Sequence, residues 1–467
     1  MARRWRPLTA AAVLAVTASL VGAADGTADP SRAVAGRPPA CAKPTPAPGQ
    51  QPPAPTPPTA TTVGQAYHCI FDNHYSGPVL DSRELLVPAF AALTQELQRR
   101  GLDRADATLP RLTGRRDADW AAFGGVYRRI ADALPDDAAR AAIATAAIRA
   151  MVDALDDNHA RWLNGFTPNP YGFDLSVTVG PGDIDPVATE PAHVTAVAAG
   201  SPAAVAGLAP GDEVLAVDGV PLFVNGVLTR GALTPADTGP GSVLRLTVRR
   251  PATGETSTAT LTAAPYQPRP RDVESRLVDG NVAYVSLPSF TPELADRALA
   301  AVAELRARTE LRGVVLDLRG NGGGNPDAVA RLLGALAHGR TTSYWCDVRG
   351  RCTPNRTDDS VELLDLPFVA LTDRRCASAC DSFASAVKDL RLGALVGTRT
   401  AGAVSGPGLP HLLDNRSILA LPKHHEVAAN GEIVNTIGVA PDHHAPVTAA
   451  DLSAGRDPGL DKAVSLL

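Results

Sequence analysis

The segment CASAC, residues 376–380, holds a serine at a point where side chains often do chemistry. The apolar run Phe368–Leu371 predicts a buried strand, and the residues after Ser378 predict a helix. A serine just after such a strand–turn–helix corner is exposed, and the N–H that follows it points outward. Ser378 is therefore a candidate nucleophile. The alternative is an ordinary serine that caps a helix, and the spacing alone favours neither.

A glycine-rich turn forms a second candidate element. In GVVLDLRGNGGGNPDAVARLL, residues 313–333, it lies between the predicted buried parallel strand Val314–Leu318 and a helix. N–H groups at a helix N-terminus bind negative charge. A nucleotide-binding loop is disfavoured, because no Gly-Lys-Ser/Thr follows and the GxGxxG spacing is absent. The same geometry suits an oxyanion hole.

Several segments must position these residues. The sequence predicts a multidomain α+β protein with an N-terminal helical domain, a β-rich domain and an α/β domain whose sheet is mostly parallel. Helical periodicity predicts three helices in the first domain, and strands and helices alternate in the last one. The predicted segments are a signal peptide at 1–24, a Pro/Ala-rich linker at 25–62, the helical domain at 63–165, the β-rich domain at 166–265 and the α/β domain at 266–467. The three predicted helices are Glu84–Arg99, Asp117–Leu134 and Asp136–Leu155.

The β-rich segment contains SPAAVAGLAPGDEVLAVDGVPL, residues 201–222. Ser201 and Pro202 predict the start of a short helix that Gly207 ends. A strand follows, and Asp218-Gly219 predicts a hairpin turn. This stretch resembles a PDZ domain of the form found in exported bacterial proteases. The resemblance implies capture of a chain end on a sheet edge, with the carboxylate held by the loop of Tyr171, Gly172 and Phe173; an ordinary turn is the alternative reading of that tripeptide.

The N-terminus and the cysteines indicate the compartment. Arg3, Arg4 and Arg6 precede an apolar run from Leu8 to Val21, which predicts a secretory signal cleaved near residue 24; an uncleaved anchor is the alternative. Six cysteines in an exported chain favour disulfides. The simplest of the 15 connectivities pairs near neighbours, although the sequence cannot choose among them, and a zinc site is the competing interpretation. These local pairs are Cys41–Cys69, Cys346–Cys352 and Cys376–Cys380.

Composition excludes several classes of function. The chain has 467 residues, of which 20% are charged and 45% hydrophobic, so a disordered or fibrous protein is excluded. The net charge is -5, and no basic stripe with interleaved aromatics occurs, so we expect no nucleic-acid partner. Beyond the N-terminus no long apolar run occurs, so we expect no stable membrane insertion after signal cleavage. The histidine pairs at 424–425 and 443–444 are expected to be solvated, and we expect no metal and no organic cofactor.

Taken in order, LDLRGNGGG, TDRRCASACDSFASAVKDL and GVAPD resemble the C-terminal-processing, or tail-specific, serine peptidases and their tricorn-like branch. The resemblance covers about residues 85–450. It implies a helical part, a PDZ domain and a ClpP/crotonase-like catalytic domain. It also places the nucleophile on Ser378 and the oxyanion donors on the N–H groups of Ala379 and of Gly323 or Gly324.

The residue expected to act as general base differs from that of the processing peptidases. Their lysine lies 25 residues after the serine, where this chain has Ala403, and the chain contains only four lysines. Lys388 is about 15 Å along the same helix and cannot reach Ser378. The tricorn-like branch instead uses a histidine that ends a helix, which corresponds to His159 in ALDDNHARW. Without the resemblance, His159 would be read as a helix-terminal histidine.

The resemblance also predicts a residue that orients the base. The tricorn-like branch carries a glutamate there, and the corresponding residue of this chain is Asn435. An asparagine can orient a histidine, as in Cys–His–Asn proteases. The alternative orienting residues are Glu432, Asp156 and Asp157, and Asn158 stands where that branch carries a small polar residue.

We therefore expect a secreted serine endopeptidase whose PDZ domain captures polypeptide C-termini. A catalytically inactive binding protein on the peptidase scaffold remains an alternative, because retinoid-binding repeats resemble these domains and both the lysine and the glutamate are missing. A PDZ adaptor with a decayed enzyme domain is a third.

Overall fold

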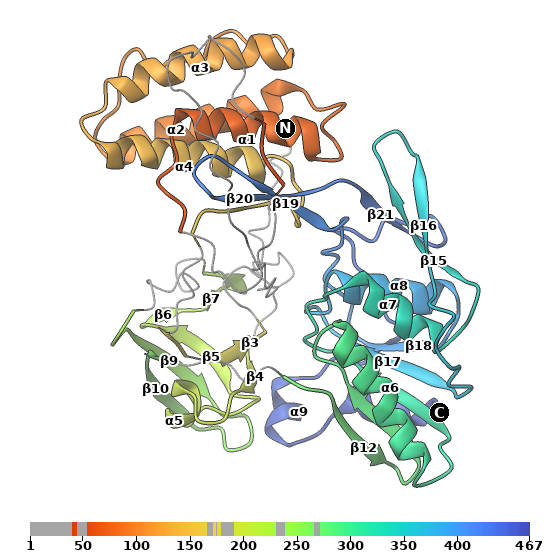
Figure 1. Cartoon of the computed structure of the whole chain (residues 1–467). Helices are drawn as coiled ribbons and strands as arrows, with labels where there is room; N and C mark the ends of the chain where they lie inside the picture. The colour runs from red at the N-terminus through yellow and green to blue at the C-terminus, as the bar shows by residue number, and fades with distance from the viewer. Residues whose placement is uncertain are drawn as a thin grey trace.

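The computed structural model describes residues 40–43, 54–165, 171–173, 175–178, 191–229, 239–265 and 271–467. Within them the chain forms a helical part, a β-rich part and an α/β part, as Figure 1 shows. The predicted signal peptide at 1–24 lies outside the described residues. In the described part, no helix is both long and apolar enough to span a bilayer.

Four helices build the first part. Three begin where a side chain caps them: Thr59, Asp81 and Asp136 each accept a hydrogen bond from the first turn. The predicted linker was expected to reach residue 62, but the cap at Thr59 starts the first helix earlier. The helices are α1 (Ala60–Asn73), α2 (Ser82–Arg99), α3 (Arg116–Asp132) and α4 (Asp137–Asp153). They share one apolar core.

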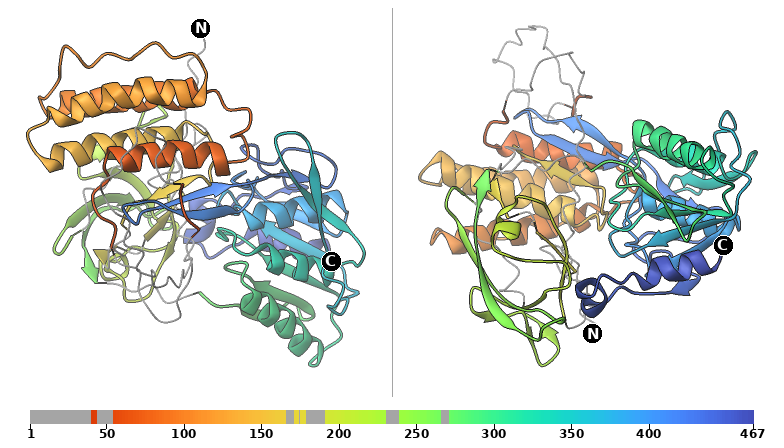
Figure 2. Two further views of the ribbon diagram at one scale, coloured as in Figure 1. Left: turned by 45° about the horizontal axis from the view of Figure 1, so that its top comes forward. Right: turned by 90° about the horizontal axis from the view of Figure 1, so that it is seen from below.

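A hairpin from far along the chain completes this core. Strands β19 (Gly408–Leu412) and β20 (Ile418–Pro422) run beneath the helices, and β20 pairs antiparallel with β1 (Arg161–Leu163). Its Leu419 and Leu421 are fully buried among the helical residues. The segment 266–467 is therefore not one separate body, since its hairpin is part of the helical core (Figure 2).

The β-rich part contains the elements predicted for a PDZ domain. Ser201 caps α5 (Pro202–Val205), and Asp218 and Gly219 both have positive φ, as a tight hairpin turn requires. One sheet has the order β10-β9-β5-β6. Its strands are β5 (Glu213–Val217), β6 (Val220–Pro221), β9 (Val243–Arg249) and β10 (Thr256–Thr262). Short pairs flank it: β2 (Tyr171–Gly172) with β11 (Ala264–Pro265), β3 (Leu175–Val177) with β4 (Val194–Val197), and β7 (Phe223–Val224) with β8 (Val227–Leu228).

The α/β part is built on a six-stranded sheet with the order β12-β13-β14-β17-β18-β22. Only the edge strand β12 runs antiparallel. Every residue of β14 and β17 is buried, as predicted for strands inside a parallel sheet. The strands are β12 (Glu274–Val278), β13 (Val282–Ser286), β14 (Gly313–Asp317), β17 (Phe368–Thr372), β18 (Ala394–Gly397) and β22 (His443–His444).

Helices cover both faces of this sheet. One face packs against α6 (Pro292–Arg306), α7 (Pro326–Gly334) and α8 (Ala379–Asp389), and the other packs against α10 (Pro458–Ser465). A second sheet joins β15 (Thr341–Cys346), β16 (Cys352–Arg356) and β21 (His425–Ala428). The short helix α9 (Ala449–Ser453) contacts the PDZ part, where Ser453 Oγ accepts a 3.2 Å hydrogen bond from Ala252 N. The predicted fold class is confirmed.

The cysteines form three disulfides between near neighbours. The pairs are Cys41–Cys69, Cys346–Cys352 and Cys376–Cys380, and no described cysteine is free. This is the simplest of the connectivities that the sequence allowed. The first pair fastens residues 40–43 to α1, and the last one brackets Ser378.

Candidate active site

Ser378 stands at the corner between β17 and α8. It is the N-cap residue of α8, and its backbone has φ 58° and ψ -120°. A positive φ is costly for a residue with a Cβ and is common at functional sites. The N–H of Ser378 donates to Asp381 Oδ2 at 2.9 Å. Ser378 is thus a helix N-cap residue, as the alternative interpretation of the sequence predicted. Its Oγ faces another part of the chain.

The group that Ser378 faces is His159. Nε2 of His159 lies 3.0 Å from Ser378 Oγ, although the two residues are 219 positions apart. His159 follows α4, directly before β1, and β1 pairs with the hairpin of the α/β part. A Cβ added to Gly408 at the start of that hairpin would lie 2.9 Å from His159 O, so glycine permits this close approach. The shared core thus holds the imidazole beside the serine.

The other ring nitrogen of His159 is held by Asn158. Asn158 Oδ1 lies 2.6 Å from His159 Nδ1, and Asn158 Nδ2 donates to Asn435 Oδ1 at 2.7 Å. With a proton on Nδ1 that Asn158 accepts, Nε2 is left as the acceptor for the Ser378 hydroxyl. Asn435 makes no hydrogen bond to His159 itself among the described residues; it holds Asn158, which in turn contacts the ring.

Asp157 supplies a negative charge next to this chain of contacts. Its Oδ1 accepts the N–H of His159 at 2.8 Å and the hydroxyl of Ser405 at 2.8 Å. Its Oδ2 lies 3.2 Å from His74 Nε2, and both side chains of that pair are 1% exposed. Ser405 N approaches His159 Nδ1 at 3.4 Å. Sequence reasoning named Asp157 as an alternative orienting residue but missed His74 and Ser405, which no motif marks.

The surroundings set the charge state of the two groups. Burial lowers the pKa of His159 below its ordinary value, and Arg161 lowers it further, while Asp157 opposes both. The imidazole is therefore neutral near pH 7 and able to accept a proton. Burial alone would raise the pKa of Asp157, but hydrogen bonds from His74, the His159 N–H and Ser405 outweigh it and lower that pKa. Asp157 is accordingly ionised.

Two backbone N–H groups beside Ser378 have no acceptor among the described residues: those of Ala379 and Gly324. Gly324 forms a parallel bridge with Phe290, in which Phe290 N and Asn325 N are the donors, so its own N–H is unused. The N–H of Gly323 instead donates to Asn321 Oδ1 at 2.8 Å. Of the two glycines named from the sequence, the geometry thus favours Gly324 as a donor.

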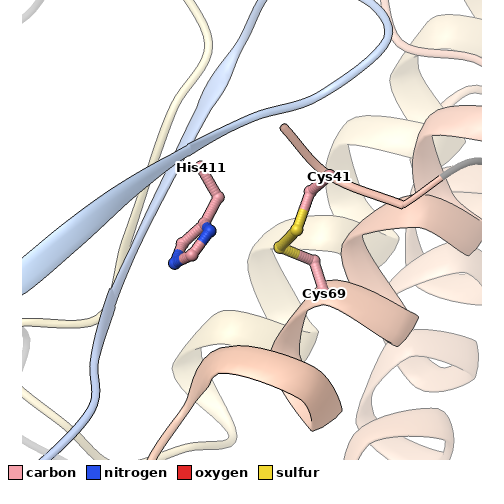
Figure 3. Close-up of side chains that lie close together, drawn as sticks. All are labelled: Cys41, Cys69 and His411. Carbon is pink, nitrogen blue, oxygen red and sulfur yellow. A yellow bond between two sulfur atoms is a disulfide. The ribbon is translucent and has the colours of Figure 1, made fainter. Parts of the chain in front are cut away.

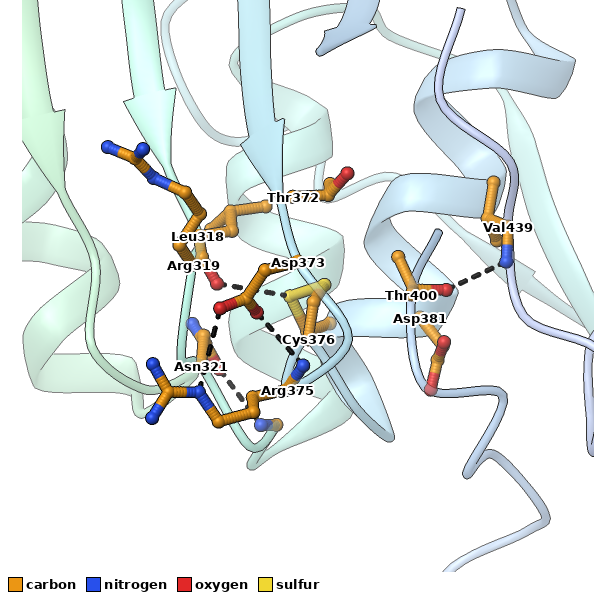
Figure 4. The surroundings of a disulfide bond; sticks show 12 residues. Leu318, Arg319, Asn321, Thr372, Asp373, Arg375, Cys376, Asp381, Thr400 and Val439 are labelled. Atoms are coloured by element: carbon orange, nitrogen blue, oxygen red, sulfur yellow. Dashed lines mark hydrogen bonds and ion pairs between the residues drawn. A yellow bond between two sulfur atoms is a disulfide. The ribbon is translucent and has the colours of Figure 1, made fainter. Parts of the chain in front are cut away.

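The glycine-rich turn touches the serine corner directly. A Cβ on Gly323 would lie 2.7 Å from Ser378 Cβ and 2.9 Å from Ala379 N. Ala377 N donates to Asn321 O at 3.1 Å, which joins the two turns. Figure 4 shows them side by side around the Cys376–Cys380 disulfide. The turn that carries the unused N–H of Gly324 thus contacts the corner that carries the unused N–H of Ala379, and donors of this kind stabilise negative charge developing on a carbonyl oxygen.

Asp381 organises the other side of the corner, which includes Ala403. Its carboxylate accepts the N–H groups of Ser378, Gly402 and Ala403 at 2.9–3.0 Å. Burial raises the pKa of Asp381 to about 6, against these hydrogen bonds and one from the Thr400 side chain. Lys388 Nζ donates to Ala440 O, away from Ser378.

The loop of the PDZ part that was predicted to bind a carboxylate is held by backbone hydrogen bonds and core packing. Tyr171 and Gly172 form β2, and Phe173 O accepts the N–H of Ala203 in α5 at 3.1 Å. Phe173 packs against the PDZ core. Peptide binding by this loop stays a prediction.

Comparisons with known proteins agree with this architecture. Residues 281–445 match the model of peptidase family S41, and residues 193–231 match the PDZ domain model. The chain is 30% identical over 323 residues to carboxyl-terminal-processing peptidase 2, chloroplastic, of Arabidopsis thaliana; the match covers 64% of this chain and 60% of that protein.

Two further similarities add to this. Putative tricorn protease homolog 2 of Streptomyces coelicolor is 32% identical over 198 residues, which is 42% of this chain and 16% of that protein. The chain thus spans less than two thirds of the length of these two relatives. A solved structure titled photosystem II D1 C-terminal processing protease shares the fold, with a TM-score of 0.51, 23% identity and coverage of 84% of this chain and 93% of that one. Residues 281–445 of this chain are therefore similar to peptidase family S41, and the segment similar to a PDZ domain precedes them.

Proposed function

We propose that this chain is a secreted serine endopeptidase that cleaves polypeptides through an acyl-enzyme on Ser378. The observation that carries the proposal is the 3.0 Å contact between His159 Nε2 and Ser378 Oγ, with Nδ1 of the same ring engaged by Asn158. A nucleophile, a base and a group that orients the base are the parts that acyl transfer needs.

The steps follow from these positions. His159 Nε2 accepts the hydroxyl proton as Ser378 Oγ attacks the scissile carbonyl, and the N–H groups of Ala379 and Gly324 hold the oxyanion. His159 then gives the proton to the leaving amine, and water releases the acyl group by the same route. These steps involve amino-acid side chains and backbone groups alone.

The charge on the imidazolium is balanced by Asp157. The relay from His159 through Asn158 ends at Asn435, which is neutral, so no charge reaches the ring by that path. Asp157 is buried, ionised and bonded to the backbone N–H of His159. We assign it the electrostatic role and assign Asn158 and Asn435 the positioning role.

Substrate class and compartment rest on the domain content. A PDZ domain next to a family S41 domain suits a polypeptide whose C-terminal end is added to a sheet edge before cleavage. Relatives carry names of carboxyl-terminal-processing and tricorn proteases, in agreement with this class. Three disulfides and the predicted signal peptide support secretion.

The test is digestion of an unfolded polypeptide by wild type and by Ser378→Ala, with products identified by mass spectrometry. We expect internal cleavage by wild type and none by the variant, with both proteins folded. Labelling by a serine-directed phosphonate separates the alternatives. If the wild-type protein is labelled and also cleaves the polypeptide, the peptidase is supported. A chain that binds C-terminal peptides without labelling or turnover would be the inactive binding protein.

A further inference from the structure

His411 is a buried imidazole with an unused nitrogen. It lies on β19 and is 3% exposed, and Nε2 has no hydrogen-bond partner. Leaving a buried polar group without a hydrogen-bond partner is unfavourable. The proposed catalytic mechanism does not use the His411 side chain. His411 lies on the β19–β20 hairpin beneath the helical part.

The imidazole faces the disulfide between Cys41 and Cys69 (Figure 3). One ligand atom from each of the three residues lies within 4.8 Å of the others. The three residues come from separate segments: the arm at 40–43, the helix α1 and the strand β19. No sequence spacing could have joined them, because His411 follows Cys69 by several hundred residues.

We propose that Cys41, Cys69 and His411 form a zinc site once their disulfide is reduced. A dithiol reductant supplies two electrons and two protons, which break the S–S bond and give two thiols, and the reductant becomes a disulfide. Zn²⁺ then displaces the two thiol protons, and two Zn–S bonds and one Zn–N bond form. Water fills the fourth position, as in sites with three protein ligands.

The required movements are small. With Zn–S bonds of about 2.3 Å in a tetrahedron, the sulfurs lie about 3.8 Å apart and the imidazole nitrogen about 3.6 Å from each. The Cα atoms of Cys41 and Cys69 are 5.8 Å apart. Rotation of the two cysteine side chains therefore opens the sulfurs, and the imidazole approaches by about 1 Å from its present limit of 4.8 Å.

Groups around the site suit a metal with two thiolates. Asn73 Nδ2 lies 3.3 Å from Cys41 Sγ and 3.5 Å from Cys69 Sγ, and amide donors of this kind stabilise thiolate ligands from the outer shell. The buried imidazole of His411 supplies the third ligand atom.

The zinc site would keep the arm at 40–43 attached to α1 both when the disulfide is formed and when it is reduced. Ala42 and Leu412 exchange backbone hydrogen bonds of 3.0 and 2.7 Å, which pair the arm with β19 beside the cysteines. The disulfide fastens the arm to α1, and zinc would fasten the arm, α1 and β19 together. Reduction without metal would leave the arm held by its backbone pairing alone.

The test uses Co²⁺ as a spectroscopic probe with the full chain. Wild type treated with a phosphine reductant should bind one Co²⁺ with thiolate charge-transfer bands and the visible bands of a tetrahedral ion, and Zn²⁺ should displace it. The oxidised protein should show neither band. His411→Ala should weaken binding by more than about 100-fold, beyond the effect of losing an outer-shell partner.

The matched control is His424→Ala, an exposed histidine on the same chain, which should bind as wild type does. Cys41→Ser/Cys69→Ser should abolish the charge-transfer bands. The proposal is overturned if reduced wild type binds no Co²⁺, a result that needs no variant to fold. It is also overturned if folded His411→Ala and His424→Ala bind equally well.

Discussion

The side-chain oxygen of Asn158 lies 2.6 Å from Nδ1 of His159, its neighbour in sequence. A residue that contacts the ring so closely sets which nitrogen carries the proton. Asn158 can play this part only while its amide is held with the oxygen toward the ring, and Asn435 is what holds it, through the 2.7 Å bond to Asn158 Nδ2.

Asn435→Glu should therefore raise activity. A carboxylate only accepts hydrogen bonds, so it would fix the Asn158 amide with its nitrogen toward residue 435 and its oxygen toward His159. A charge-assisted bond in place of a neutral one is worth about 1 kcal/mol, or about fivefold in kcat/KM. Steady-state hydrolysis of one peptide measures it. Asn435→Leu, which removes the acceptor, should lower kcat/KM; equal rates for the two variants would refute the positioning role.

His74→Ala should destabilise the protein by about 3 kcal/mol, because it leaves Asp157 charged and buried without its partner. The urea midpoint, followed by tryptophan fluorescence, reports the change. Adding Asp157→Asn should restore part of the loss by removing the unpaired charge. The pKa of Asp157 is lowered in the folded chain, so the stabilisation is present above the ordinary carboxyl range and is lost as pH falls through the lowered value. Additive effects of the two substitutions would show that the pair is not coupled.

Gly323→Ala should reduce kcat at least about 100-fold, since its Cβ would fall against Ser378 Cβ and Ala379 N, where the oxyanion is expected. Gly320→Ala is the matched control: Gly320 also has positive φ (74°), but the nearest atom to its added Cβ is 3.5 Å away. Both variants carry the backbone cost of a positive φ, and only the first closes the site. A similar kcat for the two would remove the oxyanion assignment from this turn.

Removing the disulfide that brackets the nucleophile, with Cys376→Ala/Cys380→Ala, should lower kcat by about tenfold with little change in KM. The bond holds the corner on which Ser378 sits, and a looser corner is less well preorganised. Cys346→Ala/Cys352→Ala removes the bond across the β15–β16 hairpin and serves as control. Parallel losses in the two double variants would mean that general stability, and not the serine corner, is at stake.

Much of the architecture could be predicted because local signals and fold agree. The cap at Ser201, the continuous apolar runs of β14 and β17 and the positive-φ turn at Asp218-Gly219 all lie where the sequence indicated. The hairpin at 408–422 could not be assigned to the helical core, because its alternating pattern is satisfied equally by any apolar surface.

The residues of the candidate sites likewise fall into those that the sequence predicted and those that it did not. Ser378, His159 and the glycines carry motif spacing, whereas His74, Ser405 and His411 are brought to their partners only by tertiary structure. Periodicity reports which face of an element is buried, but it does not report which distant residue meets that face. The partner of His159 Nδ1 was likewise expected to be Asn435, and the intervening position is taken by Asn158.

The most direct test of the central claim is the rate of phosphonate labelling of Ser378 as a function of pH. We predict one adduct per chain, located on Ser378. Because burial lowers the pKa of His159, the labelling rate should fall only when the imidazole is protonated, at a lower pH than for an ordinary histidine. His159→Gln should label far more slowly and lose the His159 titration. Labelling that is equally fast and has the same pH profile in His159→Gln, or an adduct that persists in Ser378→Ala, would contradict the account.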